Sequence, residues 1–200
     1  RVMKTVRMKI DVQSPSAIGT LLKRIGATPA RLIVANDHTE HDAISEIIDL
    51  VRTGAVVAFI SDAGTPAISD PGERIVRAVI DADLPVHATP GPAAFVMAAA
   101  LSGLPTARIA FDGFLQRSGA ERRERLTEVA RERRTLVLYE APHRLERTVA
   151  DLVETCGGER RIVLARELTI LYEEFWRGTL NEALAHVRAV EPRGEIRARP

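Results

Sequence analysis

Residues 55–72 read AVVAFISDAGTPAISDPG, an apolar run that opens directly into a long turn of Gly, Pro, Ser, Thr and Asp. The run 55–60 is typical of a buried strand, and the apolar spacing after Gly72 predicts a helix. In an open α/β sheet, ligands bind just beyond the carboxyl ends of the strands. Glycines let a ligand approach the backbone and prolines fix its shape. We therefore expect this first turn, residues 61–72, to bind a ligand.

A second turn of the same kind follows the predicted strand 85–89. It reads PGPAA over residues 90–94 and leads into a helix of small residues. Both turns precede helices, so free N–H groups and the positive end of a helix dipole would face a bound carboxylate or phosphate. Neither turn has the Lys of a P-loop, and no G-x-G-x-x-G motif occurs. Two tight strand-to-helix connections without a ligand are the alternative interpretation.

Strands and helices alternate through the rest of the chain, which predicts parallel βαβ units and an α/β fold. Further strands are expected at 32–35, 108–111, 135–139, 161–165 and 174–177, and helices at 42–52, 73–82, 94–101, 120–134 and from Pro142 onward. The segment 179–182 reads TLNE, a capping box that predicts the start of the last helix. Because Gly and Pro interrupt residues 103–113, we expect an N-terminal α/β domain over 1–106 and a C-terminal α/β domain over 107–200, with the ligand cleft between these two subdomains.

Composition narrows the class of protein. An apolar content of 46% can fill a core, and a net charge of +1 does not by itself indicate a nucleic-acid partner. Lys4, Lys9 and Lys23 are the lysines, and every other basic side chain is Arg. Arg suits RNA because it binds phosphate and stacks on bases, although a GC-rich genome explains the same bias. Cys156 is the single cysteine, which fits a reducing compartment. No apolar run reaches the roughly 18 residues of a membrane span, so we expect a cytoplasmic protein.

Two further strand ends carry side chains that can do chemistry. The sequence EAPHR at 140–144 follows one predicted strand, and RELT at 166–169 follows the next. His143 can titrate or position a phosphate, and a solvated helix start is the alternative. The helix 120–134 places Arg and Glu three or four residues apart. That pattern is typical of a salt-bridged face in solvent, and an RNA-facing surface is the alternative.

The segment 36–42, NDHTEHD, has the residue types of a metal site. Its histidines, His38 and His41, stand three residues apart beside carboxylates. Zinc sites draw a further ligand from a distant element, and the sequence has no second His or Cys cluster. We therefore expect a polar loop that caps a helix, and no metal.

Together these motifs resemble one known family. They occur in the order and with the spacing of the RsmI family of bacterial 16S rRNA cytidine 2′-O-methyltransferases, in the tetrapyrrole-methylase superfamily. The matching segments are 61–72, 90–94, GLP at 103–105, FDGFL at 111–115, YEAPHRL at 139–145 and ARELT at 165–169. The resemblance implies S-adenosyl-L-methionine as methyl donor, bound in a cleft between two α/β domains. It also implies a homodimer, and a cytidine ribose of 16S rRNA in the 30S subunit as substrate.

The resemblance and the positions at strand ends give the site residues that we expect. The cofactor-binding residues all lie in the two turns: Ser61, Asp62, Ala63, Gly64, Thr65, Pro66, Pro90, Gly91, Pro92 and Ala93. A ribose 2′-hydroxyl is a poor nucleophile, so a base or an orienting acceptor is expected. Since no Lys follows Lys23, the candidates are Asp62, Glu140, His143 and Glu167. The expected RNA contacts are Arg122, Arg123, Arg144 and Arg166.

The sequence departs from the family pattern near both ends. A Thr-Pro-Ile-Gly-Asn-like loop of the family's cofactor site has no counterpart in residues 1–20, and the similarity starts at 21–26. Gly194 and Glu195 resemble the start of a closing strand, but residues 196–200 lack its apolar pattern. Three functions stay open at this point: an rRNA ribose methyltransferase, a methylase of small tetrapyrroles, and a truncated, inactive remnant that at most binds RNA or a partner.

Overall fold

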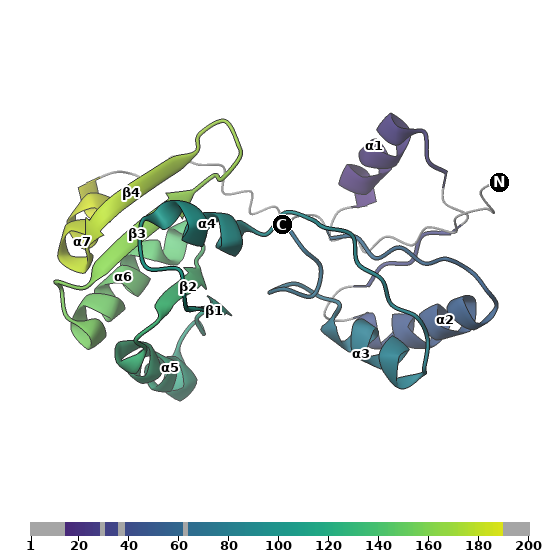
Figure 1. The fold of residues 1–200 in the computed structure, drawn as a ribbon, viewed down its shortest axis with the longest axis horizontal. Helices are drawn as coiled ribbons and strands as arrows, with labels where there is room; N and C mark the ends of the chain where they lie inside the picture. The colour runs from purple at the N-terminus through teal and green to yellow at the C-terminus, as the bar shows by residue number, and fades with distance from the viewer. Residues whose placement is uncertain (1–14, 29–30, 36–38, 62–63, 190–200) are drawn as a thin grey trace. The chain divides into compact units, whose positions relative to one another are not determined.

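The computed structural model describes residues 15–28, 31–35, 39–61 and 64–189, and they form two compact units, one within residues 1–93 and one within 94–200 (Figure 1). Each unit combines apolar segments around its own core, and the mixed α/β class that we expected is confirmed. The domain boundary after residue 106 stays a prediction. None of the helices in the described part of the chain is long and apolar enough to cross a membrane.

The first unit is built on helices whose apolar residues recur at helical spacing. Its helices are α1 (Pro15–Ile25), α2 (Glu40–Arg52) and α3 (Glu73–Asp81). Helices α2 and α3 pack together, and Ala43 and Ile47 of α2 meet Ile75 and Val79 of α3 in a buried cluster. The predicted helices at 42–52 and 73–82 are confirmed.

The strands expected in this unit are not formed. Residues 32–35, 55–60 and 85–89 have no strand assignment. Their apolar side chains do reach the core, where Ile33 and Phe59 pack against the buried cluster. A strand, however, exists only as one member of a hydrogen-bonded ladder, and among the described residues no such ladder joins these segments. The expectation of strands here was wrong for that reason.

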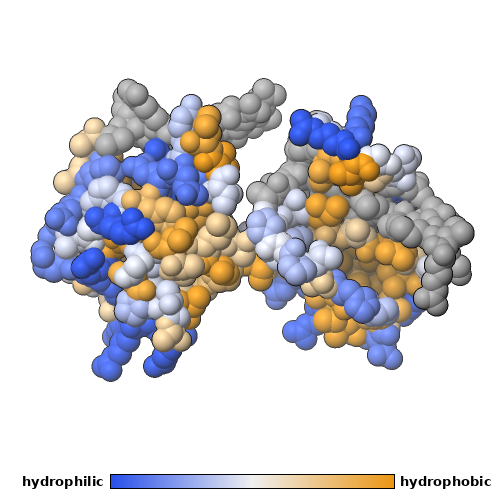
Figure 2. Space-filling view, turned by 45° about the horizontal axis from the view of Figure 1, so that its top comes forward, coloured by the Kyte–Doolittle hydropathy of each residue, from blue (hydrophilic) through white to orange (hydrophobic). Residues whose placement is uncertain are grey.

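Extended segments without a ladder leave apolar side chains in solvent. Leu32 is 50% exposed and Val56 is 57% exposed. The space-filling view shows apolar patches among the polar surface of both units (Figure 2). Leu32 and Val56 lie in segments that no ladder pairs within the described part of the first unit, and a strand buries its side chains only when neighbours cover it.

The second unit contains both βαβ and hairpin structure. It comprises α4 (Ala94–Ser102), β1 (Ile109–Phe114), α5 (Gly119–Arg131), β2 (Thr135–Tyr139), α6 (Pro142–Cys156), β3 (Arg161–Arg166), β4 (Glu174–Thr179) and α7 (Leu180–Ala189). Strands β1 and β2 are parallel, with a register shift between Phe111 and Gly113. Strands β3 and β4 are antiparallel. The expected strands and helices of this half are confirmed, although the β3–β4 hairpin departs from the expected parallel pattern.

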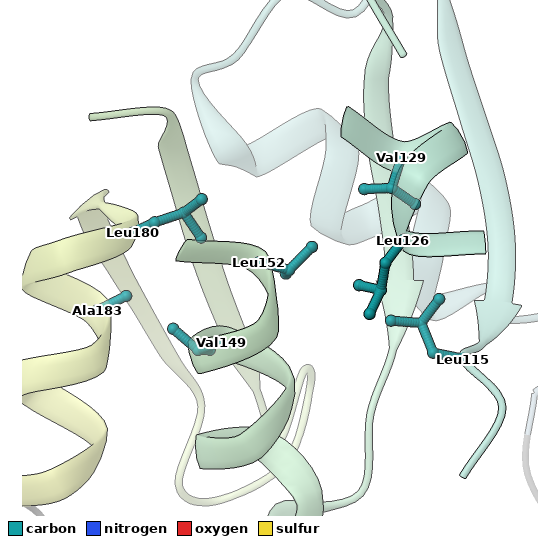
Figure 3. Packing of buried hydrophobic residues seen from close by; sticks show 7 residues of the cluster. All are labelled: Leu115, Leu126, Val129, Val149, Leu152, Leu180 and Ala183. Carbon is teal, nitrogen blue, oxygen red and sulfur yellow. The ribbon is translucent and has the colours of Figure 1, made fainter. Parts of the chain in front are cut away.

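The core of the second unit joins its helices to one another and to its strands. Leu126 and Val129 of α5, Val149 and Leu152 of α6 and Leu180 of α7 form one buried cluster (Figure 3). Helix α6 contacts both α5 and α7, so it is the central helix of this cluster. Burying each of these side chains contributes about 1.5–3 kcal/mol relative to exposure. Leu138 of β2 and Leu164 of β3 pack against the same cluster, which holds the strand ends where the candidate site residues begin.

The capping box at the start of α7 is present and gives a testable prediction. The Thr179 N–H donates to Glu182 Oε2 at 2.8 Å, and the Glu182 N–H donates back to Thr179 Oγ1 at 3.3 Å. Thr179→Ala removes the hydroxyl and should lower the free energy of unfolding by about 1 kcal/mol. Urea unfolding followed by circular dichroism checks this. Thr127→Ala, which removes an exposed hydroxyl inside α5, should change stability by less than about 0.5 kcal/mol.

The same box predicts a pH dependence. The backbone N–H of Thr179, and then its hydroxyl, hold the pKa of Glu182 below its ordinary value of 4.5. A carboxyl with a lowered folded-state pKa stabilises the fold above its unfolded pKa, and that stabilisation is lost as the pH falls through the folded pKa. The acid-side loss of stability should therefore begin near pH 4.5 and shrink in Glu182→Gln. An unchanged acid limb in that variant would contradict the assignment.

Candidate functional site

The two predicted turns lie side by side. Thr65 Oγ1, in the first turn, donates a hydrogen bond of 2.8 Å to the carbonyl oxygen of Pro92 in the second. A Cβ atom built on Gly64 would lie 4.0 Å from that same oxygen, and one built on Gly91 would lie 3.9 Å from Thr65 Oγ1. These contacts place the two turns against each other. Asp62 and Ala63, which we expected in the cofactor site, lie outside the described residues.

The first turn is held in a strained shape. Ser61 Oγ donates to the Gly64 carbonyl at 3.4 Å, and the Ala67 N–H donates to the Pro71 carbonyl at 3.1 Å. Ala67 and Ser69 have φ values of 67° and 53°, in the left-handed region that favours glycine. Each such residue costs on the order of 1–3 kcal/mol, and residues of this kind cluster at ligand sites. The strain therefore supports the interpretation of this turn as a binding element.

A buried glutamate anchors the base of the first turn. Glu40 is 4% exposed, and its Oε1 accepts a 3.0 Å hydrogen bond from the Gly72 N–H. Both line a small cavity of about 230 Å³ together with Asp70. The Asp70 Oδ2 atom is buried and has no hydrogen-bond partner among the described residues. Glu40 was not among the predicted site residues, although it shares the buried face of α2 with Ala43 and Ile47 at positions i+3 and i+7.

A buried polar network joins the ends of β1 and β2 to α5 and α6. We use this name for Arg122, Thr148, Asp151, Glu140 and Arg144. Arg122 is 3% exposed and donates to Thr148 Oγ1 at 2.9 Å, to Asp151 Oδ2 at 2.7 Å and to the Gln116 carbonyl at 2.7 Å. The Thr148 hydroxyl in turn donates to Glu140 Oε2, and Arg144 Nε lies 3.2 Å from Glu140 Oε1.

This network changes how three of the predicted site residues are understood. The Glu140 side chain is 7% exposed, and its carboxylate also accepts the Ala141 N–H at 2.9 Å. Arg144 donates to the Leu115 carbonyl at 2.5 Å. The expected RNA contact of Arg122 does not fit its burial. The signal was present in the sequence, since Arg122, Leu126 and Val129 stand at i, i+4 and i+7 on the buried face of α5.

The other predicted residues of this unit are more accessible. Arg123 and His143 are exposed on α5 and α6. Arg166, at the end of β3, pairs with Glu174 at 2.6 Å with 38% of its side chain exposed. Glu167 is half-buried and begins the β3–β4 turn with a φ of 53°. His38 lies outside the described residues, and within the described ranges no three His, Cys, Asp or Glu side chains gather as metal ligands would.

Comparison with known sequences gives the family. A model of tetrapyrrole (corrin/porphyrin) methylases matches residues 14–184. The ribosomal RNA small subunit methyltransferase I of Synechocystis sp. is 43% identical over 178 residues, covering 89% of this chain and 63% of that protein. The protein of the same name from Mycobacterium tuberculosis H37Rv is 46% identical over 159 residues, 80% of this chain and 55% of its own length. The one from Thermotoga maritima is 41% identical over 165 residues, 82% of this chain and 73% of that protein.

Solved structures give the fold. A cobalt precorrin-4 methyltransferase aligns with a TM-score of 0.63 at 16% identity, over 92% of this chain and 79% of that one. A uroporphyrin-III-C-methyltransferase from Thermus thermophilus aligns with a TM-score of 0.59 at 21% identity, over 92% and 78%. The chain spans 63% and 55% of the first two relatives' lengths. It belongs to the tetrapyrrole methylase superfamily and, within it, to the ribosomal RNA small subunit methyltransferase I family.

Proposed function

We propose that this chain binds S-adenosyl-L-methionine and methylates the ribose 2′-hydroxyl of a cytidine in 16S rRNA. Family membership supports the reaction class, and the names of the relatives support an rRNA substrate. The observation that carries the cofactor part is the hydrogen bond from Thr65 to Pro92, which joins the two Gly- and Pro-rich turns. We further propose that the protein works in the cytoplasm on the 30S subunit, as a homodimer.

The residues of the two turns fit this cofactor. S-adenosyl-L-methionine carries a carboxylate, a ribose and an adenine but no phosphate, so a site without a Lys suits it. Gly64, Pro90, Gly91 and Pro92 are exposed, and Gly64 and Gly91 have no side chain to keep a ligand away from the backbone. When bound, the cofactor supplies an electrophilic methyl group for transfer to an oxygen nucleophile. The turns would hold and orient it, which is the main contribution an enzyme makes to such a transfer.

The candidate bases differ in what surrounds them. The Glu140 carboxylate accepts hydrogen bonds from Ala141 and Thr148 and pairs with Arg144, so we propose that it positions Arg144. His143 and Glu167 have no such ties among the described residues, and we propose them, together with Asp62, as the groups that accept or orient the 2′-hydroxyl proton. For RNA contact we propose the exposed Arg123 and the accessible Arg166, because guanidinium groups bind phosphate in a bidentate way.

Titration of the chain with S-adenosylhomocysteine, the product of methyl transfer, tests the cofactor site. We expect micromolar binding by isothermal calorimetry. Thr65→Val removes the hydroxyl that joins the turns and should weaken binding about 3- to 10-fold, the equivalent of one hydrogen bond. Thr65→Ser keeps the donor and should bind like the wild type. Equal affinity in all three proteins would show that the link between the turns does not shape the site.

The substrate is tested separately. Tritium transfer from labelled S-adenosyl-L-methionine to 30S subunits should be found in a cytidine of 16S rRNA. Binding of S-adenosylhomocysteine without transfer to 30S subunits would overturn the catalytic proposal and keep the cofactor site. A folded chain that does not bind S-adenosylhomocysteine would overturn both.

A further inference from the structure

The end of β1 contains a bulge that brings two phenylalanines to one face of the sheet. Phe111 pairs with Val137 of β2, and Phe114 pairs with Tyr139. The register shifts between these two pairs, so β1 has one more residue there than β2. Alternate residues of β2 share a face, and the extra residue lets Phe111 and Phe114 follow them. A bulge of this kind re-aims the side chains beyond it.

Aromatic rings form a row on this face. Phe95, at the start of α4, stacks on Phe111 with 4.3 Å between the ring centroids, and Tyr139 meets Phe111 edge-on at 4.9 Å. The Tyr139 hydroxyl accepts the Phe95 N–H at 3.1 Å, which holds the Tyr139 ring in place. Phe114 lies 5.5 Å from Tyr139 and is 51% exposed. The row therefore ends in a ring that is open to solvent.

The backbone that follows Phe114 is held by buried groups. Leu115 is 2% exposed and packs in the core of the second unit (Figure 3). Arg144 donates to the Leu115 carbonyl at 2.5 Å, and Arg122 donates to the Gln116 carbonyl at 2.7 Å. The Phe114 ring is thus presented to solvent on an ordered backbone. A ligand that stacks on it meets a preorganised surface, and preorganisation lowers the cost of binding.

The charges around this strand end leave one guanidinium group free. Asp112 of β1 pairs with Arg125, and Glu140, which follows β2, is tied into the buried polar network. Arg117, three residues beyond Phe114, is exposed and forms no ion pair with a carboxylate in the part of the chain that the structure describes. An open aromatic face beside a free guanidinium suits single-stranded RNA, because bases stack on the ring and phosphates attract the charge.

We infer that Phe114, backed by Tyr139, stacks on an unpaired base of the rRNA substrate, with Arg117 on a nearby phosphate. The inference rests on the proposed function and adds to it where the RNA contacts the second unit. His143 lies in the first turn of α6, which begins three residues after Tyr139. A base at this strand end therefore brings its strand of RNA toward a candidate proton acceptor. Stacking tolerates any base, so this surface supplies affinity and orientation rather than the choice of cytidine.

Binding of the full chain to 30S subunits tests the inference, measured by co-sedimentation with S-adenosylhomocysteine present so that no turnover occurs. Phe114→Ala should weaken binding about 5- to 150-fold, the range for the loss of one base stacked on an aromatic ring. Phe114→Trp keeps a flat ring and should bind within about 3-fold of the wild type. Phe114→Leu keeps apolar bulk without a ring, so it should remain weak.

Three controls isolate stacking from other effects. Ile109 stands at the other end of β1, about 15 Å from Phe114, and is 36% exposed, so Ile109→Ala should bind 30S subunits like the wild type. The affinity for S-adenosylhomocysteine, measured by calorimetry, should be the same in Phe114→Ala and the wild type. Arg117→Gln should reduce the slope of log affinity against log salt by about one, whereas Phe114→Ala should leave that slope unchanged.

Several outcomes would overturn the inference. Equal 30S binding by Phe114→Ala and the wild type would show that no base stacks on the ring. Weaker binding of S-adenosylhomocysteine by Phe114→Ala would assign the ring to the adenine of the cofactor. A Tm lowered by more than about 10 °C, or a changed oligomeric state, in both Phe114→Ala and Phe114→Leu would assign it to packing.

The proposed function fails in a different way. A wild-type chain that binds 30S subunits through Phe114 but transfers no methyl group would overturn the catalytic proposal and leave the stacking surface in place. A folded wild-type chain that does not bind 30S subunits would overturn both.

Discussion

Arg122→Ala is expected to lower the free energy of unfolding by about 3 kcal/mol, the lower end of the range for breaking a buried ion pair. The side chain is 4% exposed, and its loss leaves Thr148 Oγ1 and Asp151 Oδ2 without their donor. The Gln116 carbonyl keeps only the longer hydrogen bond from Arg144, at 3.4 Å. Asp151, at 28% exposure, regains part of its solvation from water, which places the effect at the lower end. Urea unfolding at neutral pH, followed by circular dichroism at 25 °C, measures it.

The neighbouring residue is a matched control. Arg123 is on the same helix and exposed, so Arg123→Ala should change stability by less than about 0.5 kcal/mol. Arg122→Lys keeps the charge but lacks the planar fork that reaches three acceptors, so it should recover less than half of the loss. If the two Ala variants were equally stable, the buried polar network would not hold the second unit together.

The same pair separates stability from RNA binding. Arg123→Ala should weaken binding to 16S rRNA and reduce the slope of log affinity against log salt by about one. Arg122→Ala should leave that slope unchanged under conditions where the chain is folded, since a buried guanidinium contacts no phosphate. An unchanged slope for Arg123→Ala would remove this residue from the proposed RNA surface.

Gly72→Ala is expected to destabilise the first unit by about 2–5 kcal/mol, as the sum of backbone strain and overpacking. Gly72 has a φ of 126°, which L-residues rarely adopt. A Cβ at this position would lie 2.4 Å from Phe59 Cε1. Any backbone shift that relieves the contact also disturbs the hydrogen bond from Gly72 to Glu40, which is 3.0 Å long. Thermal unfolding followed by circular dichroism measures the loss.

Two further variants isolate the cause. Phe59→Leu in the Gly72→Ala background removes the ring contact but not the backbone strain, so it should recover only part of the stability. Gly91→Ala, whose Cβ would meet nothing closer than Thr65 Oγ1 at 3.9 Å, should change stability by less than about 0.5 kcal/mol. A mild effect of Gly72→Ala would mean that the turn accommodates a side chain by moving as a whole.

What the sequence could predict follows from how local each signal is. The helices and the β1–α5–β2 unit could be predicted because hydrophobic periodicity and end signals such as the TLNE box act within a few residues. A strand in the first unit would need a hydrogen-bonding partner far along the chain, so an apolar run such as 55–60 is not sufficient to form one. The two turns meet through the hydrogen bond from Thr65 to Pro92, although the described residues of the first unit form no sheet edge that would gather them.

The site residues divide in the same way. Glycines and prolines predicted both turns, because the backbone preferences of these residues are intrinsic. Glu40 and Arg122 were missed or misassigned because a charged residue in a helix is usually solvated. Such a residue is recognised as buried only by its alignment with apolar residues at i+3, i+4 and i+7 of the same helix. The partner of such a residue, as with Glu40 and Gly72, lies too far away in sequence for any motif to contain both.

The strain at Ala67 and Ser69 has a consequence for the thermodynamics of ligand binding. A turn that already has left-handed residues, internal hydrogen bonds and a tie from Thr65 to Pro92 loses its conformational entropy when the chain folds. A ligand that arrives later meets an ordered surface, and preorganisation of this kind favours affinity. Binding should therefore show a heat-capacity change set by the contact area of the ligand alone, without the larger negative value that accompanies coupled folding.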